Sequence, residues 1–406
     1  MIDTARMQAG DRPAVAGSGH AAPSADGDAR SPALAPGEVI LAHDWLVGMR
    51  GGERVLERLA ARYGPTDLHL LVDDGRPHAP AIDACRRHVS PLQRIPGGAG
   101  RWRRHLLPLM PWAVERLQPR PARLLISTSS AVMKSIRPAA GTVHVCYCHS
   151  PARYAWDQAD DYAIGAGGRI RRLGLAAIGP RFRRWDRRTA SRVDVFVANS
   201  RHTAGRIQRC WGRTAEVVHP PVRTDFFTRD VAVEREDWFL VVSALEPYKR
   251  TDLVIEAACL AGLPLRIAGG GSQATALEQQ AAAARSNGHD VQMLGRVDDD
   301  ALRSLYRRAR GLVFPQLEDF GIVPVEAMAC GCPVAAFGRG GALDTVTAQT
   351  GVHFDEQSPS AIAAAMEMLA GDGRSAADCR TWAERFSGPA FDAAMDAVVA
   401  SALEQG

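Results

Sequence analysis

The chain has 406 residues, which exceeds what one ordinary hydrophobic core organises, so the length favours two domains over a single one. The formal net charge of +4 is small for this length and gives no sign of a nucleic-acid partner, and no segment holds the roughly 20 apolar residues that a membrane span requires. The 8 cysteines are scattered at spacings that suit neither zinc sites nor redox motifs, so reduced and buried thiols are expected.

Residues 1–37 are rich in Ala, Pro, Gly, Asp and Ser and lack an apolar run, which predicts a disordered tail. The same composition excludes a secretory signal peptide, because the tail has no hydrophobic core region. A protein with neither a signal peptide nor a membrane span is expected to be cytoplasmic, or peripheral on a membrane.

Residues 38–219 are expected to form a first α/β domain. Its strand candidates are near-continuous apolar runs, which are typical of parallel sheets covered by helices on both faces. Helices fit between them, beginning for example at Gly52 and at Ser200. The expected strands are residues 39–45, 68–72, 123–129, 142–149 and 193–200.

Residues 220–236, which contain Pro220 and Pro221, are expected to link this domain to a second one at residues 237–374. Residues 375–406 are expected to add helices after the second sheet. Ligands of doubly wound sheets bind beyond the carboxyl ends of the strands, so the cleft between the two domains is the expected site. The expected strands of the second domain are residues 237–245, 263–269, 290–295, 310–315 and 333–338.

Two stretches of the first domain combine basic and apolar residues. Residues 168–192 contain nine arginines and a single acid, Asp186, and residues 101–123 have a similar character. Either stretch could meet anionic lipid, where each basic residue near the bilayer adds about 1 kcal/mol. The alternative is a solvated helix face whose apolar side packs on the core. Two such stretches in one half of the chain favour the membrane interpretation.

The segment at residues 318–326, EDFGIVPVE, is the most informative one and follows a predicted buried strand. Pro324 suits the first turn of a helix, where a missing N–H group costs nothing. The free N–H groups at the start of this helix would face the end of the strand, where the helix dipole favours an anion such as a diphosphate. Glu318 and Glu326 would then accept hydrogen bonds from hydroxyls on either side of the phosphate. Alone, Glu326 is equally well explained as a helix-start carboxylate.

Lysine is rare in this chain, because Lys134 and Lys249 are the only lysines among 49 basic residues. Lys249 directly follows a predicted strand, where a compact ammonium group suits a phosphate oxygen. Lys134 gives a weaker signal and is also explained as an ordinary helix residue.

Glycine turns and an acidic run complete the candidates. Gly51 and Gly52 open a predicted helix, and residues 269–271 are three glycines between a strand and a helix, which permits close backbone approach to a ligand. The acidic run at residues 298–300 is better explained as a helix cap with first-turn acids than as a metal site. We therefore predict no metal.

The spacing Glu, seven residues, Glu resembles the signature of retaining glycosyltransferases with the GT-B fold, the glycosyl transferases group 1. Within them the chain resembles bacterial O-antigen and exopolysaccharide mannosyltransferases, from residue 39 to about residue 386. The resemblance implies an α/β protein with two Rossmann-like doubly wound domains facing across a cleft, and a C-terminal helix that crosses back to the first domain.

The resemblance also implies roles for individual residues. Glu318 would meet the donor hexose, Glu326 the ribose hydroxyls and Lys249 a phosphate. The family arginine five residues before the lysine is replaced here by Ala244, and Arg250 or another cation would have to compensate. The assigned residues are, for catalysis, Glu318, Lys249 and His149; for donor binding, Gly51, Gly52, Arg250, Gly269, Gly271, Arg296, Val297, Phe320, Gly321, Ile322 and Glu326; and for the acceptor side, Asp44 and Arg153.

The implied function is retaining transfer of a hexose, mannose from GDP-mannose, to a lipid-linked oligosaccharide in surface polysaccharide synthesis, without a metal or cofactor. The protein would act on the inner face of the cell membrane, at an anionic surface. The alternatives are a UDP-sugar-dependent transferase of the same fold, a nucleotide-sugar 2-epimerase and a non-catalytic nucleotide-sugar-binding protein. A dinucleotide oxidoreductase is disfavoured, because no G-x-G-x-x-G follows the first strand.

Overall fold

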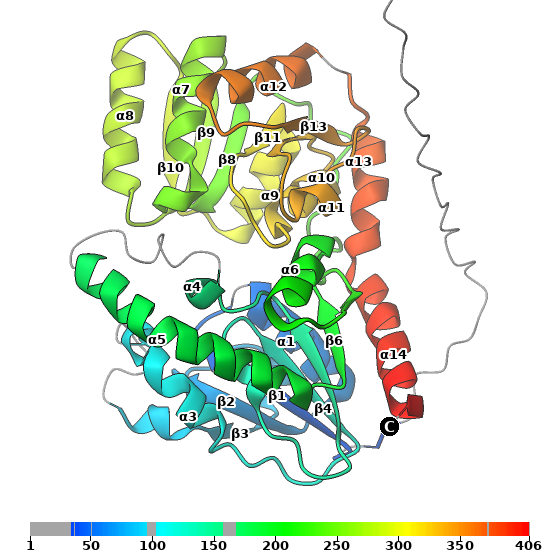
Figure 1. Ribbon diagram of the computed structural model, residues 1–406. Helices are drawn as coiled ribbons and strands as arrows, with labels where there is room; N and C mark the ends of the chain where they lie inside the picture. The colour runs from blue at the N-terminus through cyan, green and yellow to red at the C-terminus, as the bar shows by residue number, and fades with distance from the viewer. Residues whose placement is uncertain are drawn as a thin grey trace, which may run out of the picture.

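The computed structural model describes residues 34–35, 37–49, 51–95, 103–156, 168–371 and 373–405, and it shows two α/β domains stacked one above the other (Figure 1). The predicted tail at residues 1–37 lies almost wholly outside the described residues. Among the described residues, no helix is long and apolar enough to cross a membrane.

The first domain is built on a parallel sheet of seven strands in the order β3-β2-β1-β4-β5-β6-β7. Five of them contain the apolar runs that the sequence predicted. The other two, β3 and β7, were missed because they are short, largely polar strands at the sheet edges. The strands are β1 Val39–Leu46, β2 Asp67–Asp73, β3 Arg86–Val89, β4 Leu124–Ser129, β5 Val143–Cys148, β6 Val195–Ala198 and β7 Glu216–Val217.

Helices cover both faces of this sheet, and a separate hydrophobic cluster fills the space on each face. Ser200 caps α6 by accepting a hydrogen bond from the N–H of Thr203 at 3.0 Å, and Gly212 ends that helix at a φ of 69°. The helices are α1 Gly51–Tyr63, α2 Pro80–Asp83, η1 Pro91–Arg94, η2 Arg103–Leu109, α3 Met110–Val114, η3 Met133–Ser135, α4 Arg153–Trp156, α5 Gly168–Thr189, η5 Ala190–Arg192 and α6 Arg201–Trp211.

The second domain has a parallel sheet of six strands in the order β10-β9-β8-β11-β12-β13. In chain order, the first five strands match the prediction, and the sixth strand was missed. The strands are β8 Phe239–Ala244, β9 Leu265–Gly270, β10 Val291–Gly295, β11 Gly311–Phe314, β12 Val334–Phe337 and β13 Gly351–Phe354; the helices are η6 Pro247–Lys249, α7 Thr251–Ala261, α8 Ala274–Ser286, α9 Asp299–Arg308, α10 Ile322–Ala329, α11 Ala342–Thr345 and α12 Pro359–Gly371.

The C-terminal helices return to the first domain, as predicted. After α13 (Ala376–Ala383) and η7 (Glu384–Phe386), the last helix α14 (Gly388–Gln405) lies beside the lower domain in Figure 1. It buries Phe391, Met395 and Val399 in the same cluster as the β1 strand. Bidentate hydrogen bonds from Arg58 to Asp392, at 2.8 and 2.6 Å, fix the contact with α1. The predicted α/β fold with a crossing helix is confirmed.

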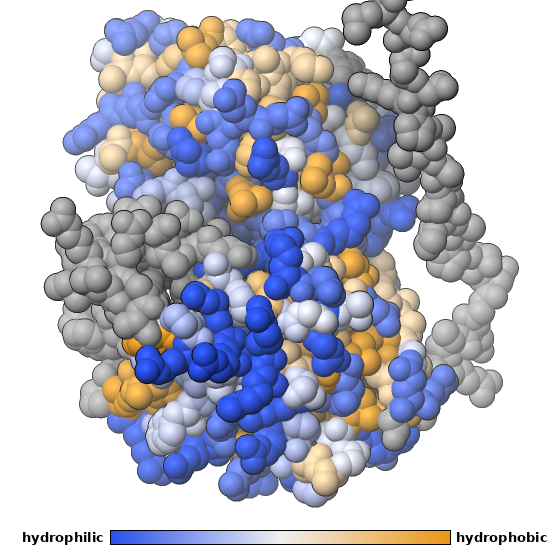
Figure 2. Space-filling view, in the orientation of Figure 1, coloured by the Kyte–Doolittle hydropathy of each residue, from blue (hydrophilic) through white to orange (hydrophobic). Residues whose placement is uncertain are grey.

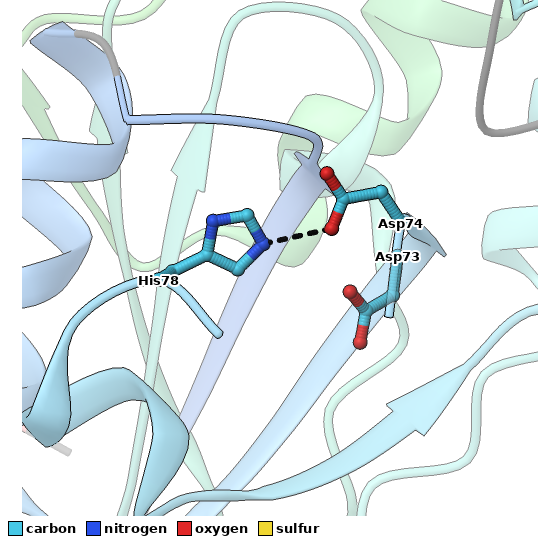
Figure 3. Close-up of side chains that lie close together, drawn as sticks. All are labelled: Asp73, Asp74 and His78. Carbon is cyan, nitrogen blue, oxygen red and sulfur yellow. Dashed lines mark hydrogen bonds and ion pairs between the residues drawn. The ribbon is translucent and has the colours of Figure 1, made fainter. Parts of the chain in front are cut away.

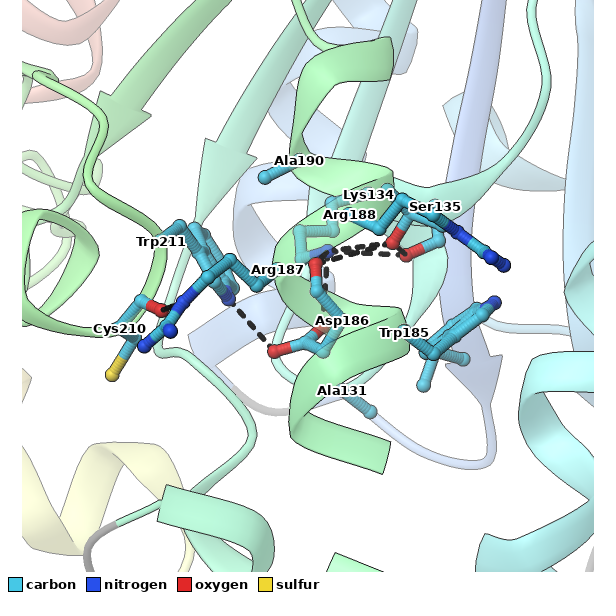
Figure 4. A network of polar contacts seen from close by, with 12 residues as sticks. Ala131, Lys134, Ser135, Trp185, Asp186, Arg187, Arg188, Ala190, Cys210 and Trp211 are labelled. Carbon is cyan, nitrogen blue, oxygen red and sulfur yellow. Dashed lines mark hydrogen bonds and ion pairs between the residues drawn. The ribbon is translucent and has the colours of Figure 1, made fainter. Parts of the chain in front are cut away.

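Lys134, one of the two lysines, is fully buried beneath α5 (Figure 4). Its Nζ lies 3.0 Å from Oδ1 of Asp186 and 2.7 Å from the Asp186 carbonyl oxygen. The indole N–H groups of Trp156 and Trp211 donate to the other oxygen of Asp186, at 2.8 and 2.7 Å. This lysine therefore belongs to the core of the first domain and ties η3 to α5.

Candidate active site

A cleft of about 540 Å³ lies between the two domains, at the carboxyl ends of both sheets. Its wall combines apolar side chains, glycines and a few polar groups from both halves of the chain. The lining residues are His43, Trp45, Val47, Gly51, Gly52, Glu53, Leu107, Met110, Ser130, His149, Ser150, Arg153, Asn199 and Pro220 from the first half, and Val242, Ser243, Ala244, Lys249, Phe314, Gln316, Glu318, Asp319, Phe320, Gly321, Ile322 and Val323 from the second.

The start of α10 forms one wall of the cleft. The helix begins at Ile322 with Pro324 in its first turn, as the sequence predicted. Gly321 precedes it at a φ of 92°, a left-handed conformation that side chains other than glycine rarely adopt. This sharp turn aims the free N–H groups of the first helical turn into the cleft, where they can bind an anion.

The start of α1 faces the start of α10 across the cleft. A Cβ atom at Gly51 would lie 2.8 Å from Cδ1 of Ile322, so the two helices approach so closely that only glycine fits without a shift. Each N-terminus carries about half a positive charge from its helix dipole. Two N-termini from different domains therefore converge on the position where a diphosphate would bind.

Lys249 and Glu318 form an ion pair in the cleft. Lys249 ends η6, directly after β8, and Glu318 lies in the loop after β11, so adjacent parallel strands bring them together. Their side chains are only 13% and 19% exposed. Arg153, from the first domain, lies 3.9 Å from the second oxygen of Glu318. The two catalytic candidates of the second domain are thus in contact.

Asp319, the residue after Glu318, joins the two domains. Its carboxylate accepts hydrogen bonds from Arg153 at 3.0 and 2.5 Å and from the buried Arg206 at 2.8 Å. Its carbonyl oxygen accepts one from the Ser200 hydroxyl at 2.5 Å. Burial alone would raise the pKa of Asp319, but the two guanidinium groups outweigh burial and hold the pKa below its usual value.

Two imidazoles of the first domain, His43 and His149, line the same cleft. His43 is buried and His149 half-buried, and desolvation of each ring lowers its pKa to about 4, so both are neutral at pH 7. Within the described residues, the Nε2 atom of each has no hydrogen-bond partner. His149 was predicted from the sequence and lies at the end of β5, whereas His43 was missed.

Two protein families match the chain, one for each domain. The glycosyltransferase family 4 model covers residues 49–226, and the model described as glycosyl transferases group 1 covers residues 222–386. The two models together cover residues 49–386, so the chain belongs to the glycosyltransferases and its second domain matches group 1. The family resemblance predicted from the Glu318 to Glu326 spacing is therefore confirmed.

One relative of this glycosyltransferase is the GDP-mannose-dependent α-(1-6)-phosphatidylinositol monomannoside mannosyltransferase of Mycolicibacterium smegmatis. It is 32% identical over 47% of this chain and 56% of the relative. A D-inositol 3-phosphate glycosyltransferase of Xylanimonas cellulosilytica is 32% identical over 52% of this chain and 58% of that protein. The chain thus spans little more than half the length of the relatives it matches.

Two solved structures share the fold over nearly the whole chain. HepE of Anabaena, in complex with UDP, superposes with a TM-score of 0.65 at 17% identity and covers 89% of this chain and 99% of HepE. Sucrose-phosphate synthase of Thermosynechococcus elongatus gives a TM-score of 0.66 at 17% identity, covering 91% and 100%. These two structures support the GT-B fold of this glycosyltransferase.

The structure places Asp44, predicted on the acceptor side, outside the cleft lining. Its buried carboxylate accepts hydrogen bonds from four consecutive backbone N–H groups, at residues 130–133, with distances of 2.6 to 3.0 Å. Burial raises the pKa of Asp44, and the four N–H donors oppose that shift. Asp44 therefore shapes the loop after β4, which carries Ser130 to the cleft wall.

Six donor-binding candidates lie outside the cleft lining, namely Arg250, Gly269, Gly271, Arg296, Val297 and Glu326. Arg250 adopts a φ of 54° and lies 3.5 Å from Asp252, and its compensation for the arginine missing at Ala244 stays a prediction. Arg296 is exposed and Val297 half-buried at the end of β10. Glu326 accepts a hydrogen bond from the Tyr306 hydroxyl at 3.2 Å, and burial raises its pKa to about 7.

Gly269 and Gly271 are required by packing between neighbouring strands. A Cβ at Gly269 would lie 1.9 Å from the carbonyl oxygen of Ser243, and one at Gly271 would lie 2.4 Å from that of Leu245. Their close backbone approach is made to the end of β8 and to Leu245 after it, and donor binding by these glycines stays a prediction. These glycines hold the two loops together behind Lys249.

A group of possible metal ligands lies away from the cleft, at the carboxyl end of β2 (Figure 3). Nε2 of His78 lies 3.0 Å from an Asp74 oxygen, and Asp73 accepts a hydrogen bond from Arg87 at 2.9 Å. The guanidinium group already supplies the positive charge there. The acids at residues 298–300 start α9, where Asp298 accepts the Ala301 N–H at 2.8 Å as a cap. The absence of a metal requirement stays a prediction.

Proposed function

We propose that this protein is a retaining glycosyltransferase that moves a hexose from a nucleotide sugar to an acceptor hydroxyl. The observation that carries the proposal is the paired Lys249 and Glu318 beside the facing N-termini of α1 and α10. This arrangement offers positive charge for a diphosphate and a carboxylate for sugar hydroxyls in one cleft.

In the proposed reaction, the bond between the anomeric carbon and the diphosphate oxygen breaks while the acceptor oxygen bonds to the same face of that carbon. The sugar passes through an oxocarbenium-like state. Lys249 and the backbone N–H groups at both helix starts stabilise the charge that develops on the diphosphate. The departing phosphate oxygen takes the acceptor proton. Glu318 orients the hexose, and contacts with the bound donor replace the ion pair between Glu318 and Lys249.

We further propose GDP-mannose as the donor and no metal requirement. A GDP-mannose-dependent relative supports the donor, and the positive charge of Lys249 and the two helix starts can replace that of a metal ion. The rival donor is a UDP-sugar, because HepE was solved with UDP. A non-catalytic binding protein is the second candidate, since Ala244 lines the cleft where the family has an arginine.

We propose a lipid-linked oligosaccharide acceptor in surface polysaccharide synthesis, and action at the anionic inner face of the cell membrane. Figure 2 shows hydrophilic side chains over the α5 region with apolar side chains beside them. Arg181, Arg184 and Arg188 of α5 are exposed, as are Leu109 at 45% and Trp112 at 47%. Phe182 packs into the core instead, so part of the apolar side of α5 contacts the rest of the domain and not a membrane. The arginine-rich start of α5 has no described side chains.

The membrane proposal is tested by flotation with vesicles that contain or lack an anionic lipid. Binding only to anionic vesicles, weakened when Arg181, Arg184 and Arg188 are changed to Gln, supports the proposal. Equal flotation of the wild type and the triple variant would assign binding to another surface.

The central test is donor hydrolysis and transfer by purified protein in EDTA, with GDP-mannose compared to UDP-sugars and other GDP-sugars. Glu318→Ala and Lys249→Ala should lose turnover. The exposed pair Arg285 and Glu278, 2.8 Å apart on α8, offers matched controls in Arg285→Ala and Glu278→Ala. Turnover of a UDP-sugar alone would change the donor. Tight binding without turnover, even with a lipid-linked acceptor, would favour the non-catalytic candidate.

A further inference from the structure

His43 presents an unused polar atom to the cleft. The residue lies on β1 and is only 4% exposed. Its Nδ1 lies 2.5 Å from the hydroxyl oxygen of Thr128 on the neighbouring strand β4, which fixes the ring. Its Nε2 has no hydrogen-bond partner within the described residues. A buried polar atom without a partner costs stability, so a ligand that supplies one gains affinity.

The Nε2 atom of His43 lies within the candidate active site. A Cβ built at Gly52 would be 3.7 Å from Cε1 of His43 and 3.5 Å from Nε2 of His149. The two imidazoles therefore flank the same glycine at the start of α1, close to the proposed diphosphate position. Burial keeps both rings neutral at pH 7, although the Trp45 backbone opposes the shift for His43.

We propose that His43 is a sugar-binding residue, whose Nε2 makes a hydrogen bond with a saccharide hydroxyl in the cleft. This inference rests on the proposed function and adds a residue to its substrate contacts. The Thr128 hydroxyl oxygen lies 3.5 Å from the Ala42 carbonyl, so the hydroxyl can donate there while it accepts the Nδ1–H of His43. In that tautomer Nε2 is an acceptor for a sugar O–H.

Two substitutions of His43 distinguish the contribution of Nε2 from that of Nδ1. His43→Asn keeps a polar group near the Nδ1 position, beside Thr128, and removes the Nε2 position. His43→Gln extends its amide to the Nε2 position. Losing one hydrogen bond should weaken saccharide binding roughly 3- to 10-fold in His43→Asn, and His43→Gln should recover most of it. Equal losses in the two variants would overturn the proposal.

The saccharide has two possible sources, and binding measurements distinguish them. Calorimetry compares GDP-mannose with GDP, and UDP-glucose with UDP. If the hydroxyl belongs to the donor, His43→Asn weakens binding of the nucleotide sugar and leaves that of the free nucleotide unchanged. If it belongs to the acceptor, both affinities stay the same and the KM for a lipid-linked acceptor rises. A His43→Asn protein of wild-type thermal stability with no change in any of these would overturn the proposal.

Failure of the proposed function gives a different result. A wild-type protein that neither binds nor turns over any nucleotide sugar contradicts the glycosyltransferase activity. The role of His43 is then tested by ¹⁵N NMR of the histidine side chains during titration with methyl α-mannoside and methyl α-glucoside, with His43→Asn used to assign the signal. A shift of the His43 Nε2 signal supports saccharide binding, and no shift with either sugar overturns it.

Discussion

Arg153 of the first domain donates two hydrogen bonds, at 3.0 and 2.5 Å, to one carboxylate oxygen of Asp319 in the second domain. The other oxygen of Asp319 accepts from the buried Arg206 at 2.8 Å. Because Glu318 is the adjacent residue, the contact that holds the domains together and the proposed sugar-orienting carboxylate share one loop. The contact between the domains therefore positions the loop that carries Glu318.

Asp319→Asn should open the cleft and lower the stability of the domain contact. The change removes the carboxylate charge that pairs with the buried Arg206, and breaking a buried ion pair of this kind costs about 3 kcal/mol. We expect a larger radius of gyration in small-angle scattering and a higher KM for the donor. Asp344→Asn is the matched control, because Asp344 also pairs across the domains, with Arg201, but that arginine is 74% exposed. Its loss should cost less than that of Asp319, because the Arg201 guanidinium group stays in contact with water. Equal effects of both variants would contradict a specific role for Asp319.

Gly51→Ala should reduce donor turnover, because the added Cβ would lie 2.8 Å from Cδ1 of Ile322 and displace that side chain in the space between the two helix starts. We expect a loss of at least about 10-fold in kcat/KM, since a shift near 1 Å at a reacting site can cost about 100-fold. Ile322→Val removes that Cδ1 atom. The double variant should therefore recover most of the activity, measured by donor hydrolysis. No recovery would mean that the loss arises from α1 alone.

The stability of the protein should depend on the ionisation of Glu326. Burial raises the pKa of Glu326 from 4.5 to about 7, so the folded protein holds this proton more tightly than the unfolded chain. The stabilisation from protonation is complete below pH 4.5 and is lost as the pH rises to about 7. Urea unfolding between pH 5 and 8 should therefore show a fall in the free energy of unfolding that Glu326→Gln lacks. Parallel pH profiles would show that Glu326 titrates at its ordinary value.

The sequence predicted the parts of this fold that depend on local patterns. Apolar runs located five strands of each sheet, and Pro324 located the start of α10. The edge strands β3 and β7 were not predicted, because a polar or two-residue strand has no hydrophobic pattern of its own.

Contacts between distant residues could not be predicted in this way. Asp319 meets Arg206 across 113 residues, and Asp44 meets the loop after β4 across 86. Such pairs form only because the strand order brings them together, and the local patterns of a single sequence carry no signal of strand order. His43 was missed for the same reason, since its exposure to the cleft follows from the register of β1 with β4.

Lys134→Met should destabilise the first domain without touching the cleft. It removes the ammonium partner of the buried Asp186, whose carboxylate then keeps the two indole N–H groups as partners among the described residues, and breaking a buried ion pair costs about 3–5 kcal/mol. Adding Asp186→Asn removes the second charge and keeps an oxygen for the indole groups. The double variant should therefore be more stable than Lys134→Met alone in urea unfolding. A double variant that is less stable than the single one would mean that the Asp186 charge still has a compensating partner when the lysine is absent, and that the pair contributes little to the stability of the domain.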